Sequence, residues 1–224
     1  MLFENIINFI DKYYHFKRIN SYLKKLKINN VIDVGFHKGE FYESMSLKKN
    51  YRYYAFEANP KIYNYIKKKF YYSKKIKIFN ICISDKFENR KFYINNLSST
   101  SSLYKDSQFY NFFKKIFLRK NKNFNINFQT ESLDRFLIRN PINLKNSLLK
   151  IDVEGGEYFV LKGIKKNLNK ISYLLVENKF FLKKQNKNIE KINFFLVSNN
   201  FILRKKFIYP LLNFEDRLYI NKSI

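Results

Sequence analysis

Three carboxylates follow a short apolar run in the segment LLKIDVEGGEYFVLKG, which covers residues 148–163. Asp152 ends the apolar run, Glu154 stands at the mouth of a two-glycine turn, and Glu157 comes directly after that turn. A carboxylate at the buried end of a strand is costly unless it has a use. We therefore predict that Asp152 and Glu154 are catalytic. We interpret Glu157 as a helix-capping residue, because a helix dipole favours an acid in the first turn.

A second acid, Glu177, ends the apolar run YLLVEN and is followed by Asn178. If the two runs are neighbouring parallel strands, Asp152 and Glu177 come to the same edge of a sheet. A carboxylate placed there can take the proton of a reacting hydroxyl, so we predict Glu177 as a third catalytic residue. We predict no bound metal. Should a divalent cation bind, Asp152, Glu177 and Asn178 would offer the hard oxygen ligands that suit Mg²⁺.

A second group of candidate binding residues lies in VIDVGFHKGE, where Asp33, Gly35 and Gly39 occupy the loop that leaves an apolar strand. Ligands of doubly wound sheets bind at the carboxyl ends of the strands, and glycines there let the backbone approach them. Glu57 ends the next apolar run, where an acid meets the two hydroxyls of a nucleoside ribose. Asp33 would repel a pyrophosphate but suits an ammonium group. This favours S-adenosylmethionine over a dinucleotide as the cofactor.

Alternating strands and helices must position these residues. Apolar runs predict strands at residues 30–35, 51–60, 75–84, 147–155, 171–180, 201–207 and 216–221, and helical spacing occurs at 4–26, 40–49, 61–72, 157–169 and 188–200. This order predicts right-handed βαβ units and a mainly parallel sheet with helices on both faces. We predict one domain over 1–224, with a helical extension at 1–28 and a hairpin and lid-like insertion at 90–128. Thr130 or Ser132 is the expected N-cap of a short helix after the insertion.

Over residues 31–179 the sequence resembles the FkbM family of S-adenosylmethionine-dependent methyltransferases. The resemblance rests on VIDVGFHKGEF, YAFEANP, SSTSSLY, TESLDRFL and, above all, LLKIDVEGGEYFVLKG. It implies the class I methyltransferase fold, a Rossmann-like α/β fold whose seven-stranded, mainly parallel sheet has an antiparallel last strand.

The resemblance also implies which residues hold the cofactor: Asp33, Gly35 and Gly39 at its methionine part, Glu57 at its ribose, and Ser84 and Asp85 beside its adenine. Phe36 and His37 depart from the family, whose members commonly have a small residue and then asparagine at these positions. We interpret His37 as a polar substitute and not as a catalytic base.

The family implies O-methylation of a hydroxyl, and we expect the acceptor to be a sugar of a surface glycan or a related small metabolite. Two alternatives remain open. One is methylation of RNA, and the other is a non-catalytic basic binding protein that retains the fold. Acceptor pockets of this fold are built from variable segments, here residues 1–28 and 98–128, so the sequence does not identify the acceptor.

The chain is strongly basic, since 44 Lys and Arg against 18 Asp and Glu give a net charge of +26. The lysines are spread along the whole chain and accompany an excess of other residues with AT-rich codons. We therefore expect no nucleic-acid partner, although the charge is compatible with a weak attraction to acidic membrane surfaces. Cys82 is the only cysteine, which excludes an internal disulfide and a multi-thiolate metal site. Without a secretory signal or a run of about 20 apolar residues, we expect a cytoplasmic protein.

Overall fold

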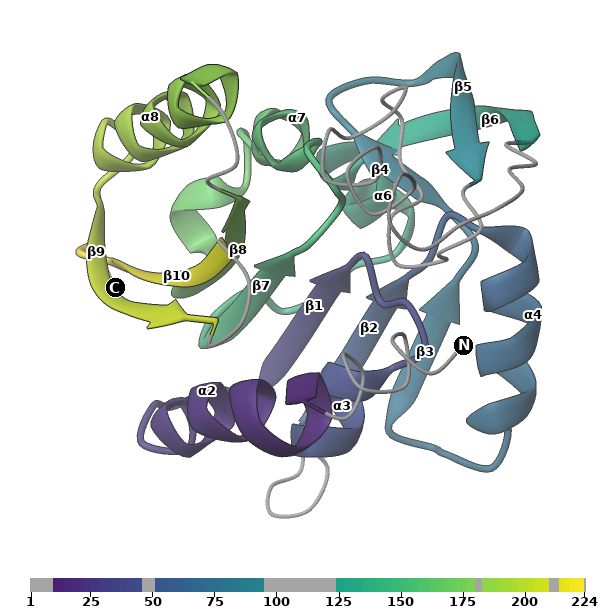
Figure 1. Ribbon diagram of the computed structural model, residues 1–224, viewed down its shortest axis with the longest axis horizontal. Coiled ribbons are helices and arrows are strands. Elements are labelled where there is room, and N and C mark those ends of the chain that lie inside the picture. The colour runs from purple at the N-terminus through teal and green to yellow at the C-terminus, as the bar shows by residue number, and fades with distance from the viewer. Residues whose placement is uncertain (1–9, 46–50, 95–123, 180–182, 210–213, 224) are drawn as a thin grey trace.

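The structure is a computed structural model, and it describes residues 10–45, 51–94, 124–179, 183–209 and 214–223. Its centre is a seven-stranded sheet in the order β3-β2-β1-β7-β8-β10-β9 (Figure 1). These strands are β1 (Asn30–Val34), β2 (Arg52–Phe56), β3 (Ile76–Phe79), β7 (Ser147–Ile151), β8 (Tyr173–Lys179), β9 (Phe201–Ile208) and β10 (Phe214–Asn221). The first five of the order pair in parallel, whereas β10 is antiparallel to both β8 and β9. This confirms the predicted fold class.

Helices cover both faces of the sheet, as the alternating sequence pattern predicts. One face carries α2 (Phe16–Leu23), which continues the π-helical turn η1 (Asp11–His15), together with α3 (Glu40–Met45) and α4 (Pro60–Lys69). The other face carries α6 (Leu133–Arg139), α7 (Glu157–Gly163), α8 (Lys183–Val197) and the 3₁₀ turn η3 (Leu168–Lys170). No helix of the described residues has both the length and the apolar surface that crossing a membrane would require.

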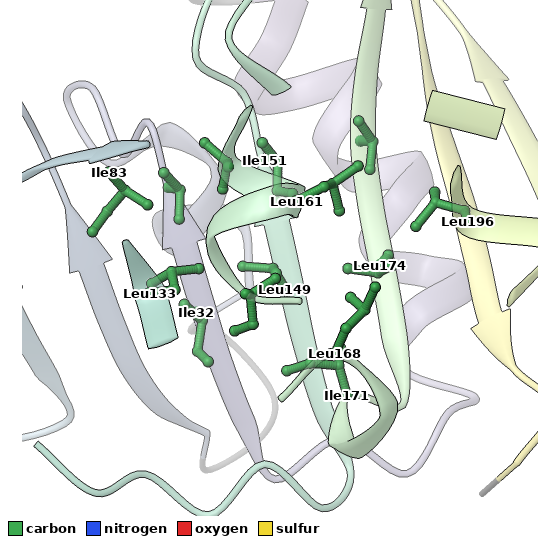
Figure 2. Packing of buried hydrophobic residues seen from close by; sticks show 14 of the residues in the cluster. Ile32, Ile83, Leu133, Leu149, Ile151, Leu161, Leu168, Ile171, Leu174 and Leu196 are labelled. Atoms are coloured by element: carbon green, nitrogen blue, oxygen red, sulfur yellow. The ribbon is translucent and has the colours of Figure 1, made fainter. Parts of the chain in front are cut away.

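Successive side chains of each central strand serve opposite layers, because side chains alternate along a strand. Ile32 of β1 and Leu149 of β7 pack with Leu161 of α7, as Figure 2 shows. Their strand neighbours Val31 and Leu148 belong to the cluster on the α2 and α3 side. Both layers are therefore apolar, and charged groups on these strands stand out as exceptions.

The predicted strand over residues 75–84 is divided in two, which corrects the sequence interpretation. β3 ends at Phe79, and β4 (Cys82–Ser84) joins a second sheet in the order β4-β6-β5, with β5 (Glu88–Ile94) and β6 (Phe124–Ser132). The division falls at Asn80, whose side-chain amide donates to the backbone oxygens of Glu57 and Ala58, at 2.8 and 3.1 Å. These side-chain bonds take the place of the backbone hydrogen bonds that a strand continuing through Asn80 would make. The rest of the predicted insertion, residues 95–123, lies outside the described residues.

Two helix boundaries follow from single residues. Ser132 is the N-cap of α6, since its hydroxyl accepts from the backbone N–H of Arg135 at 3.2 Å. The hydroxyl of Thr130, the other candidate, instead donates to backbone oxygens of the β4–β5 turn. The helix expected at 157–169 ends early, at Gly163, because glycine is a poor helix former.

Candidate active site

The carboxyl ends of β1, β2, β7 and β8 meet at one edge of the sheet and carry most of the predicted site residues. Asp33 of β1 lies directly opposite Lys150 of β7, and both side chains point to the α3 side. Lys150 donates to a carboxylate oxygen of Asp33 and to one of Asp152, both at 3.2 Å. The hydroxyl of Tyr53 donates to the second oxygen of Asp33 at 2.5 Å. Lys150 thus links Asp33 of β1 to Asp152, which follows β7.

Lys150 is a functional candidate that the sequence reasoning did not single out. Its side chain is 3% exposed, and a lysine is almost never buried without a charged partner. Burial alone would lower its pKa, but the charges of Asp152 and Asp33 outweigh burial and hold the pKa above its ordinary value. Lys150 therefore stays charged. The signal was present in LLKIDVEG, where a lysine interrupts an otherwise apolar strand.

Asp33 has no exposed surface, and its partners here are Tyr53 and Lys150. Through Lys150, Asp33 is linked to Asp152. The structure places Asp33 at the end of β1, on the predicted edge of the sheet, and its contact with the methionine part of the cofactor stays a prediction.

Three acids converge beyond the ends of β7 and β8. One carboxylate oxygen each of Asp152, Glu154 and Glu177 lies within 4.8 Å of the others, and all three side chains are partly exposed. Glu154 has a backbone φ of 57°, a left-handed conformation that is strained for a residue with a Cβ. The turn is fixed by Glu157, whose carboxylate accepts from the N–H of Gly155 at 2.8 Å. The turn therefore places Glu154 beside the two strand-end acids.

Asn178 is not part of this convergence. Strand alternation places it on the face opposite Glu177, together with Val176, whose oxygen accepts from its side-chain amide at 3.0 Å. Its buried Oδ1 finds no hydrogen-bond partner among the residues that the structure describes. A divalent cation at this edge would accordingly have Asp152, Glu154 and Glu177 as its carboxylate ligands, with Glu154 in the place that sequence reasoning gave to Asn178.

The glycine turn after β1 is shaped by contacts within the protein. A Cβ at Gly35, which has a φ of 90°, would lie 1.7 Å from the backbone oxygen of Asp152. The turn also donates to Glu57 through the N–H of His37, which bonds one carboxylate oxygen at 2.8 Å. The other oxygen accepts from the N–H of Asn59, the N-cap of α4, at 2.7 Å. Glycine is required at position 35 because the turn after β1 passes close to the backbone of Asp152 after β7. Glu57 and Asp152 therefore lie at the same edge of the sheet, on either side of this turn.

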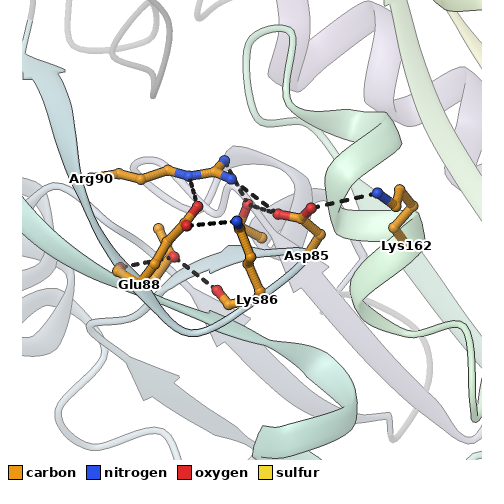
Figure 3. Close-up of polar contacts among 7 residues, drawn as sticks. Asp85, Lys86, Glu88, Arg90 and Lys162 are labelled. Carbon is orange, nitrogen blue, oxygen red and sulfur yellow. Dashed lines mark hydrogen bonds and ion pairs between the residues drawn. The ribbon is translucent and has the colours of Figure 1, made fainter.

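Ser84 ends β4. Asp85, which follows it, takes part in a charged network (Figure 3). The carboxylate of Asp85 is 3.2 Å from Arg90 of β5 and 3.6 Å from Lys162 of α7. The hydroxyl of Ser84 donates to Asp85 at 3.2 Å and accepts from Arg90 at the same distance. The network ties the second sheet to α7, and it holds Asp85 in one orientation.

His37, in the glycine turn after β1, has a pKa that depends on two neighbouring acids. Its Nδ1 lies 3.3 Å from the carboxylate of Glu40. Burial lowers its pKa, but the hydrogen bond to Glu40 and the charges of Glu40 and Glu57 raise the pKa above its ordinary value. A raised pKa means that protonated His37 stabilises the fold fully below the unfolded pKa of about 6.5, and that this contribution is lost as pH rises through the folded value.

We expect His37→Asn to reveal this dependence. Asparagine tolerates the φ of 52° at this position and does not titrate. The free energy of unfolding of the wild type, minus that of the variant, should be larger at about pH 5.5 than at about pH 8.5, because only protonated His37 gains from Glu40. Urea denaturation at the two pH values measures it. An equal difference at both would show that the pair with Glu40 has no effect on stability.

A mainly parallel seven-stranded sheet with an antiparallel β10, a glycine turn after β1 and an acid after β2 together define a class I methyltransferase. The chain belongs to the FkbM methyltransferase family, since the family profile described as "Methyltransferase FkbM domain" matches residues 33–203. S-adenosylmethionine is accordingly its cofactor.

Two solved structures with the same fold have low sequence identity to this chain. A putative O-methyltransferase from Klebsiella pneumoniae has a TM-score of 0.54 at 6% identity, over 93% of this chain and 80% of that chain. A protein of the NADB-Rossmann superfamily from Streptococcus agalactiae has a TM-score of 0.55 at 11% identity, over 94% and 69%. At these identities the likeness shows the fold alone. No curated protein sequence matches the chain.

The residues at the ends of β1 and β2 fit S-adenosylmethionine. Each oxygen of Glu57 accepts one backbone N–H and retains a second lone pair, which a ribose hydroxyl can use. Glu57 is 8% exposed as a residue, so both backbone bonds are largely shielded from water and hold the orientation of its side chain. A carboxylate in this place also disfavours a phosphate, in agreement with a cofactor that has none.

Proposed function

We propose that the protein transfers the methyl group of S-adenosylmethionine to a hydroxyl oxygen, on a sugar of a surface glycan or on a related small metabolite. The observation that carries this proposal is the convergence of Asp152, Glu154 and Glu177 at the strand edge next to the glycine turn. A neutral hydroxyl must lose its proton when it is methylated, so its enzyme benefits from a nearby carboxylate. The location that we propose is cytoplasmic, and the whole chain acts as one domain.

On the cofactor side, Glu57 would bind the ribose hydroxyls and the turn of Gly35 and Gly39 would lie along the methionine part. Ser84 and Asp85 would lie beside the adenine, with Asp85 oriented by Arg90 and Lys162. Asp33 would act through Lys150. When bound, the cofactor supplies an electrophilic methyl group on a sulfonium.

On the acceptor side, Asp152 and Glu177 would hold the hydroxyl of the acceptor, and one of them would receive its proton as the new carbon–oxygen bond forms. Lys150 keeps Asp152 in place through the 3.2 Å contact to one of its oxygens. Glu154, held at its strained φ, would contact the acceptor from the turn. Positioning is the main contribution of such a site, because the reacting groups must be aligned.

We expect Glu57→Gln to weaken cofactor binding by about 1.5–3 kcal/mol, because the amide replaces a charged acceptor by a neutral one and opposes a backbone N–H with an NH₂ group. Calorimetric titration with S-adenosylmethionine measures this. Glu190→Gln, an exposed change on α8, is the matched control and should bind like the wild type. An unchanged dissociation constant for Glu57→Gln would remove Glu57 from the cofactor site.

The net charge of +26 favours RNA as a second candidate acceptor. If the lysines reflect AT-rich codon usage and not RNA recognition, RNA binding should be weak, equal across sequences, and lost as salt is raised. Sequence-selective binding that survives physiological salt would favour the RNA alternative.

The proposed reaction is tested by incubating the protein with S-adenosylmethionine labelled in its methyl group and with separate glycan, small-molecule and RNA fractions of a cell extract. We expect label in the glycan or small-molecule fraction. Label confined to RNA would establish the alternative. Binding of the cofactor with transfer to no fraction would favour the non-catalytic reading.

A further inference from the structure

His15 is a buried histidine that the proposed reaction does not yet use. It closes the π-helical turn η1 at the start of α2, and its side chain is 1% exposed. Its Nε2 lies 2.7 Å from a carboxylate oxygen of Asp216 on β10, a contact between residues 201 positions apart in the chain. Figure 1 shows α2, which η1 directly precedes, against the same side of the sheet as α3. The contact therefore joins the N-terminal extension to the antiparallel strand.

Asp216 is a neighbour of the acceptor-side acids. It is the Cα partner of Glu177 in the antiparallel pair of β8 and β10. Side chains of directly opposite residues lie on the same face with Cβ atoms about 5 Å apart. The charge of Asp216 also contributes to the raised pKa of Lys150, which places it within electrostatic reach of that ammonium. His15 and Asp216 thus extend the row of Lys150, Asp152 and Glu177 by one strand.

The contact with Asp216 assigns the tautomer of His15. A carboxylate only accepts hydrogen bonds, so the proton of a neutral imidazole is on Nε2 and Nδ1 carries a lone pair. This Nδ1 is buried and finds no hydrogen-bond partner in the part of the chain that the structure describes. A buried acceptor without a partner destabilises the fold. A tether between η1 and β10 would need only one ring nitrogen, so the described residues give the second nitrogen no structural role.

The surroundings of His15 strengthen any bond that Nδ1 makes. The rings of Phe16, Tyr209 and Phe214 pack around the imidazole, at centroid distances of 5.9, 5.0 and 6.2 Å. A hydrogen bond made among apolar rings competes with little water and is therefore stronger than one at the surface.

We propose that Nδ1 of His15 accepts a hydrogen bond from a hydroxyl of the methyl acceptor, so that the turn η1 forms part of the acceptor subsite. This inference rests on the proposed O-methyl transfer. It assigns His15 to acceptor recognition and Asp216 to fixing its tautomer and orientation. An acceptor recognised in this way carries a second hydroxyl beside the one that is methylated, as the polyhydroxylated ring of a sugar does.

Two substitutions separate the two nitrogens. His15→Gln can still donate to Asp216 from the position of Nε2, but it has no atom in place of Nδ1. His15→Asn keeps a polar atom near the position of Nδ1 and loses the contact with Asp216. Thermal unfolding, calorimetry with S-adenosylmethionine and steady-state kinetics should be measured for both, with the fraction that the wild type methylates as the acceptor.

We expect His15→Gln to unfold at the temperature of the wild type and to bind the cofactor equally well. Its kcat/KM for the acceptor should fall roughly 3–10-fold, the loss of one hydrogen bond, and the fall should appear in KM. His15→Asn should unfold at a lower temperature. If His15→Gln has a wild-type KM and only His15→Asn is impaired, the histidine is a structural tether and the inference is wrong. If the wild type transfers methyl groups to no hydroxyl compound, the proposed function fails, and this inference fails with it.

Discussion

Asp152→Asn should lower methyl transfer by about 10²–10⁴-fold while the protein stays folded and binds S-adenosylmethionine. The substitution preserves the volume of the side chain and removes the charge that would accept the proton of the hydroxyl. Asp152 is partly exposed, with a side-chain accessibility of 28%, so a neutral amide there is tolerated by the fold. Initial rates with labelled cofactor, together with calorimetry for cofactor binding, measure the two properties separately.

Glu177→Gln is the companion variant and should also lose activity, because its carboxylate converges with that of Asp152. Chelator distinguishes two forms of the site. If the acids act directly, EDTA leaves the wild-type rate unchanged. If they hold a divalent cation, EDTA abolishes the rate and added Mg²⁺ restores it. Full activity of both variants in the presence of chelator would show that these acids have no part in the reaction.

The second large effect concerns the buried cation. Lys150→Met should lower the free energy of unfolding by about 3–5 kcal/mol, because it leaves Asp33 buried without a compensating charge. Asp33 is fully buried and the side chain of Lys150 is 3% exposed, so water cannot replace the ammonium. Urea denaturation measures the loss. Lys191→Met, an exposed change on α8, should leave the stability nearly unchanged.

A double variant identifies the cause. Asp33→Asn together with Lys150→Met removes the buried charge as well as its partner, so it should be more stable than Lys150→Met alone. If the double variant is less stable than the single one, the loss comes from packing of the lysine stem and not from the unpaired carboxylate.

The order of elements and the strand-end acids could be predicted from the sequence. Apolar runs that end in Asp152 and Glu177 identify two strands and also the edge at which their side chains meet, because parallel strands share an orientation. Glu154 could be predicted from its position in the turn. Its left-handed φ could not, because glycine, which readily adopts that conformation, stands next to it at Gly155.

Contacts between distant segments could not be predicted. The bond of His15 to Asp216 joins residues 201 positions apart, and no local pattern encodes it. The division of the 75–84 strand depends on Asn80 reaching the carbonyls after β2, which is again a tertiary contact. Lys150 is a different case. A lysine within a buried strand indicates a charged partner, although only the pairing of β1 with β7 identifies that partner as Asp33.

The central claim is that the acids at the ends of β7 and β8 direct a methyl group to a hydroxyl oxygen. It is tested most directly with S-adenosylmethionine carrying a ¹³C methyl group, the fractionated extract, and the wild type beside Asp152→Asn. The carbon spectrum of the product distinguishes a methyl group on oxygen from one on nitrogen or carbon. We predict an O-methyl signal on a sugar or small hydroxyl compound with the wild type, reduced at least 100-fold with Asp152→Asn. A methyl group found on nitrogen or carbon, or an O-methyl signal equally strong with both proteins, would contradict this account.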